Sequence, residues 1–146
     1  MLIRVHKLKK SFGNTIVLNG IDLEIKCNDR IGLVGRNGCG KTTLANILTG
    51  SLEYDEGNII VTSRKQIKIG YLQQLEMDPE LYLNTLDARG EFQRWASNLG
   101  IKALPDWPKK RLQNLSGGER TKLALAKVWA AQPDLVILDE PTNHIF

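Results

Sequence analysis

Apolar and polar residues alternate in two stretches near the start of the chain. Residues 2–6 alternate in this way, and residues 16–25 do so again. A period of two residues is typical of strands that bury one face. Gly13 and Asn14 lie between the two stretches and favour a turn. The pattern therefore predicts two antiparallel strands joined by a tight connection.

The pattern changes after residue 30. A short apolar run at 31–34 stands directly before a segment rich in glycine, and residues 42–48 then place apolar side chains at helical spacing. Gly50 follows, and glycine is the preferred residue just beyond the end of a helix. We expect a strand, a loop and a short helix in that order.

Two further short strands are predicted at 58–62 and 67–72, with a turn before the first of them. The character then becomes helical, and residues 79–115 are interpreted as a small helical insert. Three apolar residues of this insert fall on one helical face: Phe92, Trp95 and Leu99. Such a face is expected to pack against the rest of the protein.

The last part of the chain predicts a helix followed by a strand. Residues 117–131 are apolar nearly all round, so this helix is expected to be buried. Residues 135–138 form a continuous apolar run, which is typical of a strand inside a parallel sheet covered on both faces. Together the elements predict one α/β domain with an antiparallel β region at its start, a parallel core and the helical insert.

Composition narrows the class of protein. The 146 residues suit one domain with a core, and 42% hydrophobic with 25% charged residues is ordinary for a soluble globular protein. The formal charge of +4 is mild: it fits a solvated surface, with a polyanion such as RNA as the alternative. Two distant cysteines and no long apolar stretch predict a reduced, cytoplasmic protein that is not embedded in a membrane.

The glycine-rich segment carries the clearest chemistry. Residues 35–42 read GRNGCGKT and satisfy the pattern G-x-x-x-x-G-K-[ST]. Glycines let successive backbone N–H groups turn toward phosphate oxygens, and the following helix presents its positive end. Lys41 would reach the terminal phosphates, and Thr42 would offer its hydroxyl to Mg²⁺. The alternative is a plain glycine turn between core elements.

Two adjacent carboxylates follow the last predicted strand. Asp139 would hold the magnesium shell, and Glu140 would orient and deprotonate an attacking water, which are two requirements of γ-phosphate hydrolysis. The alternative is that the two acidic residues simply end the strand in solvent, and the pair alone does not distinguish the two interpretations. The phosphate loop upstream is what favours the chemical interpretation.

A second glycine pair opens the helix at 117. Ser116 and Glu119 have the spacing of a capping box, in which each satisfies the backbone N–H of the other. Gly117 and Gly118 nevertheless cost the helix on the order of 1 kcal/mol each relative to alanine. Close approach of the bare backbone to a phosphate would explain why glycine stands there.

Taken in order, four segments resemble the motifs of the ATP-binding cassette family. They are GRNGCGKTT, a glutamine after the strand at 67–72, LSGGE, and LVILDEPTNH. The likeness runs from end to end of the chain, in the family order. It implies a P-loop NTPase core, binding of Mg·ATP, and ATP hydrolase activity with Glu140 as catalytic residue.

The resemblance also implies roles for single residues. Phe12 matches the aromatic that stacks on adenine, with a core or turn aromatic as the alternative. Gln74 matches a glutamine that senses Mg²⁺ and the γ-phosphate and assists catalysis, with Gln73 as the alternative register. Thr42, Gln74 and Asp139 would contact the metal. The nucleotide-binding residues are Phe12, Gly35, Asn37, Gly38, Cys39, Gly40, Lys41, Thr42 and Thr43.

The LSGGE segment is similar to the family signature, which contacts ATP held by a second cassette. Its residues here are Ser116, Gly117, Gly118 and Glu119. The resemblance therefore implies that two cassettes work as a pair, in separate chains or in one tandem chain. Each site would combine Lys41 of one cassette with Ser116 of the other.

The residues after Asp139 are similar to the F subfamily, whose members are soluble tandem cassettes that act on ribosomes, some conferring antibiotic resistance. The ribosome and its RNA are then the expected partner. The alternatives are the nucleotide-binding subunit of a membrane transporter, held by a permease, and an ATP-binding fragment without coupled work. The short insert between Gln74 and Leu115 lacks the long arm of some F members.

Two departures from the family pattern lead to separate expectations. Family members continue past the position of His144 and later supply a histidine to the γ-phosphate, a role that neither His6 nor His144 matches. Residues 1–146 thus resemble a single incomplete cassette, expected to bind ATP rather than complete its hydrolysis. Cys39 replaces a small loop residue, so alkylation of its thiol is expected to block ATP binding, with plain space filling as the alternative.

Overall fold

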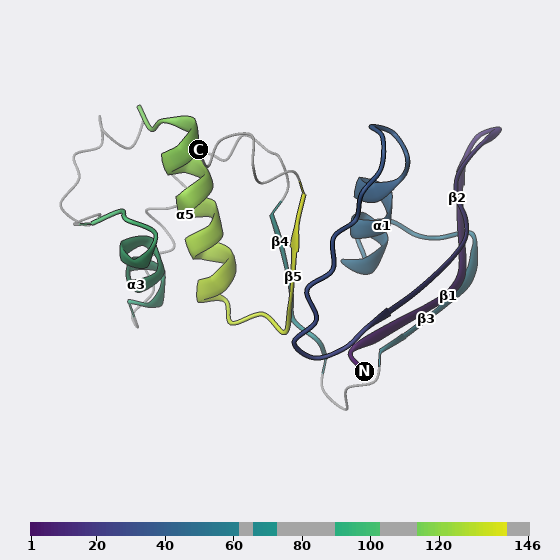
Figure 1. Cartoon of the computed structure of the whole chain (residues 1–146), viewed down its shortest axis with the longest axis horizontal. Helices are drawn as coiled ribbons and strands as arrows, with labels where there is room; N and C mark the ends of the chain where they lie inside the picture. Colours follow the sequence, from purple (N-terminus) through teal and green to yellow (C-terminus); the bar gives the residue numbers. More distant parts are fainter. Residues whose placement is uncertain (62–65, 73–89, 103–113, 140–146) are drawn as a thin grey trace. The chain divides into compact units, whose positions relative to one another are not determined.

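The computed structural model describes residues 1–61, 66–72, 90–102 and 114–139. The chain divides into two compact units, Met1–Ile67 and Lys68–Phe146, each of which is described by itself. Figure 1 traces the chain from the N-terminal strands to the C-terminal helix and strand.

The first unit is built on a three-stranded antiparallel sheet in the order β2-β1-β3. The strands are β1 (Ile3–Phe12), β2 (Thr15–Ile25) and β3 (Glu56–Val61). Phe12 pairs with Thr15 across the Gly13-Asn14 turn, which confirms the predicted antiparallel pair. Figure 1 shows β1 between the other two strands. The first strand extends well past the predicted residue 6.

An irregularity in β1 explains why the alternation stops at residue 6. The strand register shifts between Val5 and Leu8, and Lys7 has a φ of 48°. As a result Val5 and Leu8 are both buried, although they are three residues apart and a regular strand would place them on opposite faces. The Lys7 N–H donates to Asp22 Oδ1 at 2.9 Å instead of joining the ladder.

Glycine is required opposite this bulge. Gly57, in β3, has a φ of 104°, and a Cβ atom there would lie 2.6 Å from the carbonyl oxygen of Lys7 and 2.7 Å from the Cα of Leu8. No side chain fits at such distances from backbone atoms. The bulge of β1 and the glycine of β3 are therefore one structural feature.

Charged residues extend β1 beyond its apolar part. The Lys9 Nζ lies 2.8 Å from Glu56 Oε2, and the Lys10 Nζ lies 3.1 Å from Asp55 Oδ1. The Ser11 N–H also donates to Asp55 Oδ2 at 2.7 Å. These cross-strand pairs explain why a lysine-rich segment forms a strand, which alternation of apolar residues did not indicate.

Asp55 gives the first unit a predicted dependence on pH. The hydrogen bond from the Ser11 N–H, and then the Lys10 ammonium, lower the pKa of Asp55 below its ordinary value of 3.8. The stabilisation is therefore complete above that ordinary value and is lost as the pH falls through the lowered one. We expect Asp55→Asn to lower the urea midpoint at neutral pH, and the difference from wild type to shrink in acid. A difference that stays constant with pH would contradict this account.

Helix α1 (Lys41–Leu48) follows the glycine-rich loop, as predicted for 42–48. Its end is a Schellman motif: the Gly50 N–H donates to the Ile47 oxygen at 3.1 Å, and the Ser51 N–H donates to the Asn46 oxygen at 2.9 Å. Gly50 has a φ of 78°, which this motif needs. The predicted cap at Gly50 is confirmed.

The strand predicted at 31–34 is not formed. Its apolar residues are exposed, with Ile31 at 46%, Leu33 at 48% and Val34 at 97%. A strand exists only through hydrogen bonds to a neighbour, and none of the strands in the described residues pairs with this segment. An apolar run indicates that its side chains favour burial. Burial alone does not produce a strand.

The second unit contains a parallel pair of strands. β4 (Ile69–Leu72) and β5 (Leu135–Leu138) run parallel, with Ile69 opposite Leu135 and Leu72 opposite Leu138. These strands confirm the predictions for 67–72 and 135–138. Full burial of β5 on both faces was wrong for the described residues, since three of its residues are half-buried and Leu138 is 42% exposed.

In the described part of this unit, two helices carry most of the buried apolar residues. They are α3 (Glu91–Asn98) and α5 (Gly117–Ala130). Phe92 and Leu123, at 1% and 0% exposure, belong to one apolar cluster between them, and the rings of Trp95 and Trp129 stack at 5.8 Å. Trp95 and Leu99 pack on this cluster, which confirms the predicted apolar face at 92, 95 and 99. Most of the predicted insert, 79–115, lies outside the described residues. None of the helices in the described parts is long and apolar enough to cross a membrane.

Candidate nucleotide-binding site

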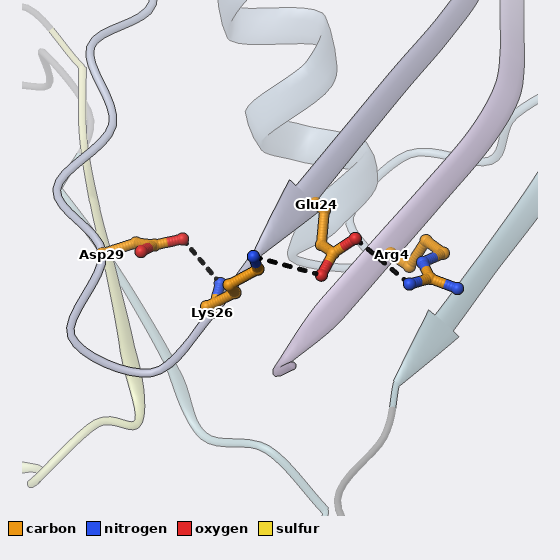
Figure 2. Close-up of polar contacts among 4 residues, drawn as sticks. All are labelled: Arg4, Glu24, Lys26 and Asp29. Carbon is orange, nitrogen blue, oxygen red and sulfur yellow. Dashed lines mark hydrogen bonds and ion pairs between the residues drawn. The ribbon is translucent and has the colours of Figure 1, made fainter.

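The approach to the glycine-rich loop is set by a polar turn after β2. Figure 2 shows Glu24 between Arg4 and Lys26, with its carboxylate 3.1 Å from the Arg4 guanidinium and 3.9 Å from the Lys26 Nζ. The Lys26 N–H donates to Asp29 Oδ2 at 2.8 Å, and the Asp29 N–H donates back to the Lys26 oxygen at 3.3 Å. This closed turn ends the strand and directs the chain toward residues 31–40.

The loop itself is folded around the ammonium group of Lys41. The Lys41 Nζ donates to the backbone oxygens of Gly35 at 2.8 Å and Arg36 at 3.1 Å. The Cys39 N–H donates to the Arg36 oxygen at 3.2 Å and closes a turn inside the loop. The positive charge of Lys41 is thereby held against backbone oxygens of the loop.

Three glycines make this loop possible. Gly38 and Gly40 have φ values of 80° and 98°. A Cβ at Gly40 would lie 2.8 Å from a methyl of Leu18, and a Cβ at Gly35 would lie 2.5 Å from the Cys39 sulfur. Of the two glycines that the phosphate-loop pattern requires, Gly40 is therefore also required by local geometry, whereas a Cβ at Gly35 would meet only the side chain of Cys39.

The start of α1 has neither a capping side chain nor an acidic residue. Gly40 is the N-cap and has no side chain to accept a hydrogen bond, and the first turn contains no acidic residue. The positive end of the helix dipole favours an anion at this point. Lys41 and Thr42 stand in that first turn, and Asn37 and Thr42 are exposed.

Phe12 belongs to the same unit as the loop. Its side chain is 49% exposed at the end of β1, so its ring is not part of the core. The Lys10 Nζ lies 5.4 Å from the ring centroid. The ring faces solvent in large part, as a stacking platform must.

The remaining predicted residues fall in the second unit. The capping box is present: the Glu119 N–H donates to Ser116 Oγ at 3.2 Å, and the Ser116 N–H donates to Glu119 Oε2 at 2.9 Å. Asp139 follows β5, and its N–H donates to the Leu72 oxygen at 3.0 Å. Gln73, Gln74 and Glu140 lie outside the described residues, so their predicted roles stay predictions.

Sequence reasoning missed Tyr71. Its hydroxyl donates to Asp139 Oδ2 at 3.4 Å, from the strand that pairs with β5. The signal lay in the parallel register, which places Tyr71 beside Ile137, two residues before Asp139. This register cannot be obtained from one strand considered alone.

Cys39 carries a chemical test of the loop. The thiol is exposed, and its sulfur lies 3.9 Å from the Lys41 Nζ. We expect an alkyl group there to crowd Gly35 and Lys41 and to abolish ATP binding. Cys27 is exposed as well, so the measurement uses the Cys27→Ser chain, modified with N-ethylmaleimide and titrated with Mg·ATP. Retention of full affinity after complete modification of Cys39 would show that the thiol only fills space.

Comparison with known proteins agrees with these observations. The family model described as "ABC transporter" matches residues 18–143. The chain belongs to the ATP-binding cassette family. Cassettes of this family bind ATP, usually with Mg²⁺, and work in pairs as ATPases.

Individual relatives indicate which subfamily the chain resembles most. The chain is 37% identical to YdiF of Bacillus subtilis over 99% of its own length and 30% of that protein. It is 36% identical to the ribosome protection protein VmlR of the same species, over 98% of this chain and 27% of VmlR. The cassette is most like the F subfamily. It spans about a third or less of the length of these relatives.

A solved structure confirms the fold. A nucleotide-free ATP-binding cassette from an ABC transporter matches 96% of this chain and 69% of that one, with a TM-score of 0.76 and 21% identity. The predicted α/β P-loop NTPase fold with an antiparallel N-terminal β region is therefore confirmed.

Proposed function

We propose that this cassette binds Mg·ATP at the loop of residues 35–43 and, paired with a second cassette, hydrolyses it to drive conformational work on the ribosome. The observation that carries the proposal is the loop itself. Its lysine is hydrogen bonded to two backbone oxygens of the loop, and the helix behind it begins at a glycine cap with no acidic residue in its first turn. Both features favour the binding of a chain of phosphates, whereas a plain turn would need neither of them.

The residues divide the work as follows. Lys41 exchanges its two backbone carbonyls for phosphate oxygens, and loop N–H groups bind the same phosphates. Phe12 stacks on the base. Thr42, Gln74 and Asp139 supply oxygen donors of the kind that Mg²⁺ prefers, and the metal would neutralise phosphate charge. Tyr71 holds the Asp139 carboxylate by its hydrogen bond.

Hydrolysis requires further groups around the γ-phosphate. Glu140 orients and deprotonates the attacking water, and Gln74 assists it. Ser116, with Gly117 and Gly118, completes the site of the partner cassette. An isolated cassette of this kind binds ATP and hydrolyses it poorly, because some of the groups around each nucleotide come from the other copy.

One relative supports the ribosomal role. VmlR, over a third identical across nearly the whole chain, is a ribosome protection protein. The alternative is the nucleotide-binding subunit of a membrane transporter, the setting named in the family description. A third possibility is an ATP-binding fragment without coupled work.

One experiment tests pairing and a second tests the partner. The ATPase rate of the chain is measured over a range of protein concentrations, with Lys41→Ala as the blank. A rate that rises more steeply than in proportion to concentration is expected, and strict proportionality would contradict pairing. Cosedimentation with ribosomes that depends on ATP supports the ribosomal role, whereas solubility that depends on a co-expressed membrane protein supports the transporter.

A further inference from the structure

A lysine contacts the ring of Phe12 at the end of β1. The ammonium group of Lys10, two residues earlier in the same strand, lies over the face of this ring, 5.4 Å from its centroid. A cation within about 6 Å of a ring centroid is attracted by the negative face of the ring. Lys10 therefore covers one face of the ring, and a base can stack only on the other.

An acidic partner holds Lys10 in this position. The Lys10 Nζ lies 3.1 Å from Asp55 Oδ1, and the lysine side chain is only 14% exposed, although lysine usually lies in solvent. Asp55 is fixed in turn, because its other carboxylate oxygen accepts the Ser11 N–H at 2.7 Å. The contacts thus run from the backbone of β1 through Asp55 and Lys10 to the Phe12 ring.

The phosphate loop approaches the strand that pairs with Lys10. In the ladder of β1 and β2, Lys10 stands opposite Leu18. Leu18 is close to the loop, because a Cβ atom at Gly40 would lie 2.8 Å from a methyl group of Leu18. Neighbouring strands lie about 4.8 Å apart. Lys10 is therefore one strand away from a residue that meets the phosphate loop.

The alternative use of Lys10 is a direct attraction of its charge for the phosphates. The Asp55 carboxylate beside the Lys10 ammonium offsets this charge at longer range. Lys41 differs in this respect, since its ammonium is hydrogen bonded to neutral backbone oxygens of the loop. The contacts of Lys10 therefore favour a role at the ring.

We propose that Lys10 is a positioning residue for the nucleotide base, which fixes the Phe12 ring and reserves its other face for the base. The inference rests on the proposed function, since it takes Phe12 as the residue that stacks on the base. A side chain that is already immobilised loses less conformational freedom when a ligand binds. Lys10 thus adds to the affinity for nucleotides without contacting them.

Lys10→Met removes the ammonium group and keeps a long, unbranched side chain. A cation–π contact at an exposed site corresponds to a factor of about two to five in affinity, so this variant should bind a non-hydrolysable Mg·ATP analogue more weakly by about that factor. Inorganic tripolyphosphate with Mg²⁺ has no base. It should therefore bind wild type and Lys10→Met equally.

Three further variants make the comparison specific. Lys9→Met is the matched control, because the Lys9 Nζ also has an acidic partner, Glu56 at 2.8 Å, and this variant should leave both ligands unchanged. Lys10→Arg keeps a cation that can lie over the ring and should restore the affinity for the analogue. In a Phe12→Leu background, Lys10→Met should have no further effect, since the ring is gone.

Calorimetry on the 146-residue chain gives distinct outcomes. Weaker binding of the analogue alone, restored by Lys10→Arg, supports the proposal. Equal affinity of wild type and Lys10→Met for the analogue overturns it, as does an equal loss for analogue and tripolyphosphate, and both leave the proposed function standing. Binding of neither ligand by the wild type overturns the proposed function as well.

Nuclear magnetic resonance of the wild type decides the question if Lys10→Met does not fold. Protons above an aromatic ring are shifted upfield by the ring current, so the Lys10 Hε signals should be shifted upfield in the free chain. The shift should persist when the ATP analogue binds, because the base and the ammonium group occupy opposite faces of the ring. Loss of the shift on binding, or its absence in the free chain, would overturn the proposal.

Discussion

Replacement of Lys41 by alanine is expected to weaken Mg·ATP binding by about tenfold to a hundredfold. A hydrogen bond to a charged group contributes about 1.5–3 kcal/mol, and each 1.4 kcal/mol is a factor of ten in affinity. The lysine is already hydrogen bonded to two loop carbonyls without ligand, so part of its interaction energy is exchanged rather than gained. This exchange places the expected loss within that range and not above it.

The measurement is isothermal titration calorimetry with ATP and with GTP. Lys26→Ala is the matched control, because it removes the same charge from an exposed lysine of the same unit, whose Nζ lies 3.9 Å from Glu24. Since the loop reads phosphates, Lys41→Ala should weaken both nucleotides by a similar factor and Lys26→Ala neither. Unchanged affinity in Lys41→Ala would remove the loop from the binding site.

Replacement of Phe92 by alanine is expected to lower the free energy of unfolding by about 3–5 kcal/mol. The ring is 1% exposed in the cluster between α3 and α5, so its removal loses buried apolar surface and leaves a cavity. The free energy of unfolding of a domain is only about 5–15 kcal/mol, so this one substitution removes a large part of it.

Urea unfolding followed by circular dichroism measures this loss. Phe12→Ala is the matched control, since the same substitution at a side chain that is 49% exposed should change stability by less than about 1 kcal/mol. A similar, small effect of both substitutions would mean that the cluster does not hold the second unit together.

The sequence predicted features that depend on neighbours along the chain. The capping box at Ser116 and the cap at Gly50 were found from spacing alone, because their hydrogen bonds join residues a few positions apart. The apolar face of α3 was found for the same reason. The family motifs then placed these elements in one known fold.

Features that depend on distant partners were missed. The extension of β1 to Phe12 follows from ion pairs with Asp55 and Glu56, more than forty residues away. The contact of Tyr71 with Asp139 follows from a parallel register. A strand was predicted at 31–34 because these residues are apolar. Strand formation depends on hydrogen bonds to a neighbouring strand, and the pattern of apolar residues does not show whether such a neighbour exists.

The bulge at Lys7 restricts how this sheet can change in evolution. A chain carrying the bulge admits only glycine at position 57, because any larger residue would meet backbone at 2.6 Å. A chain that lost the extra residue of β1 would free that position for a side chain. Positions 7 and 57 should therefore vary together among sequences that share this sheet, a covariation that arises from the backbone of one strand and owes nothing to ATP.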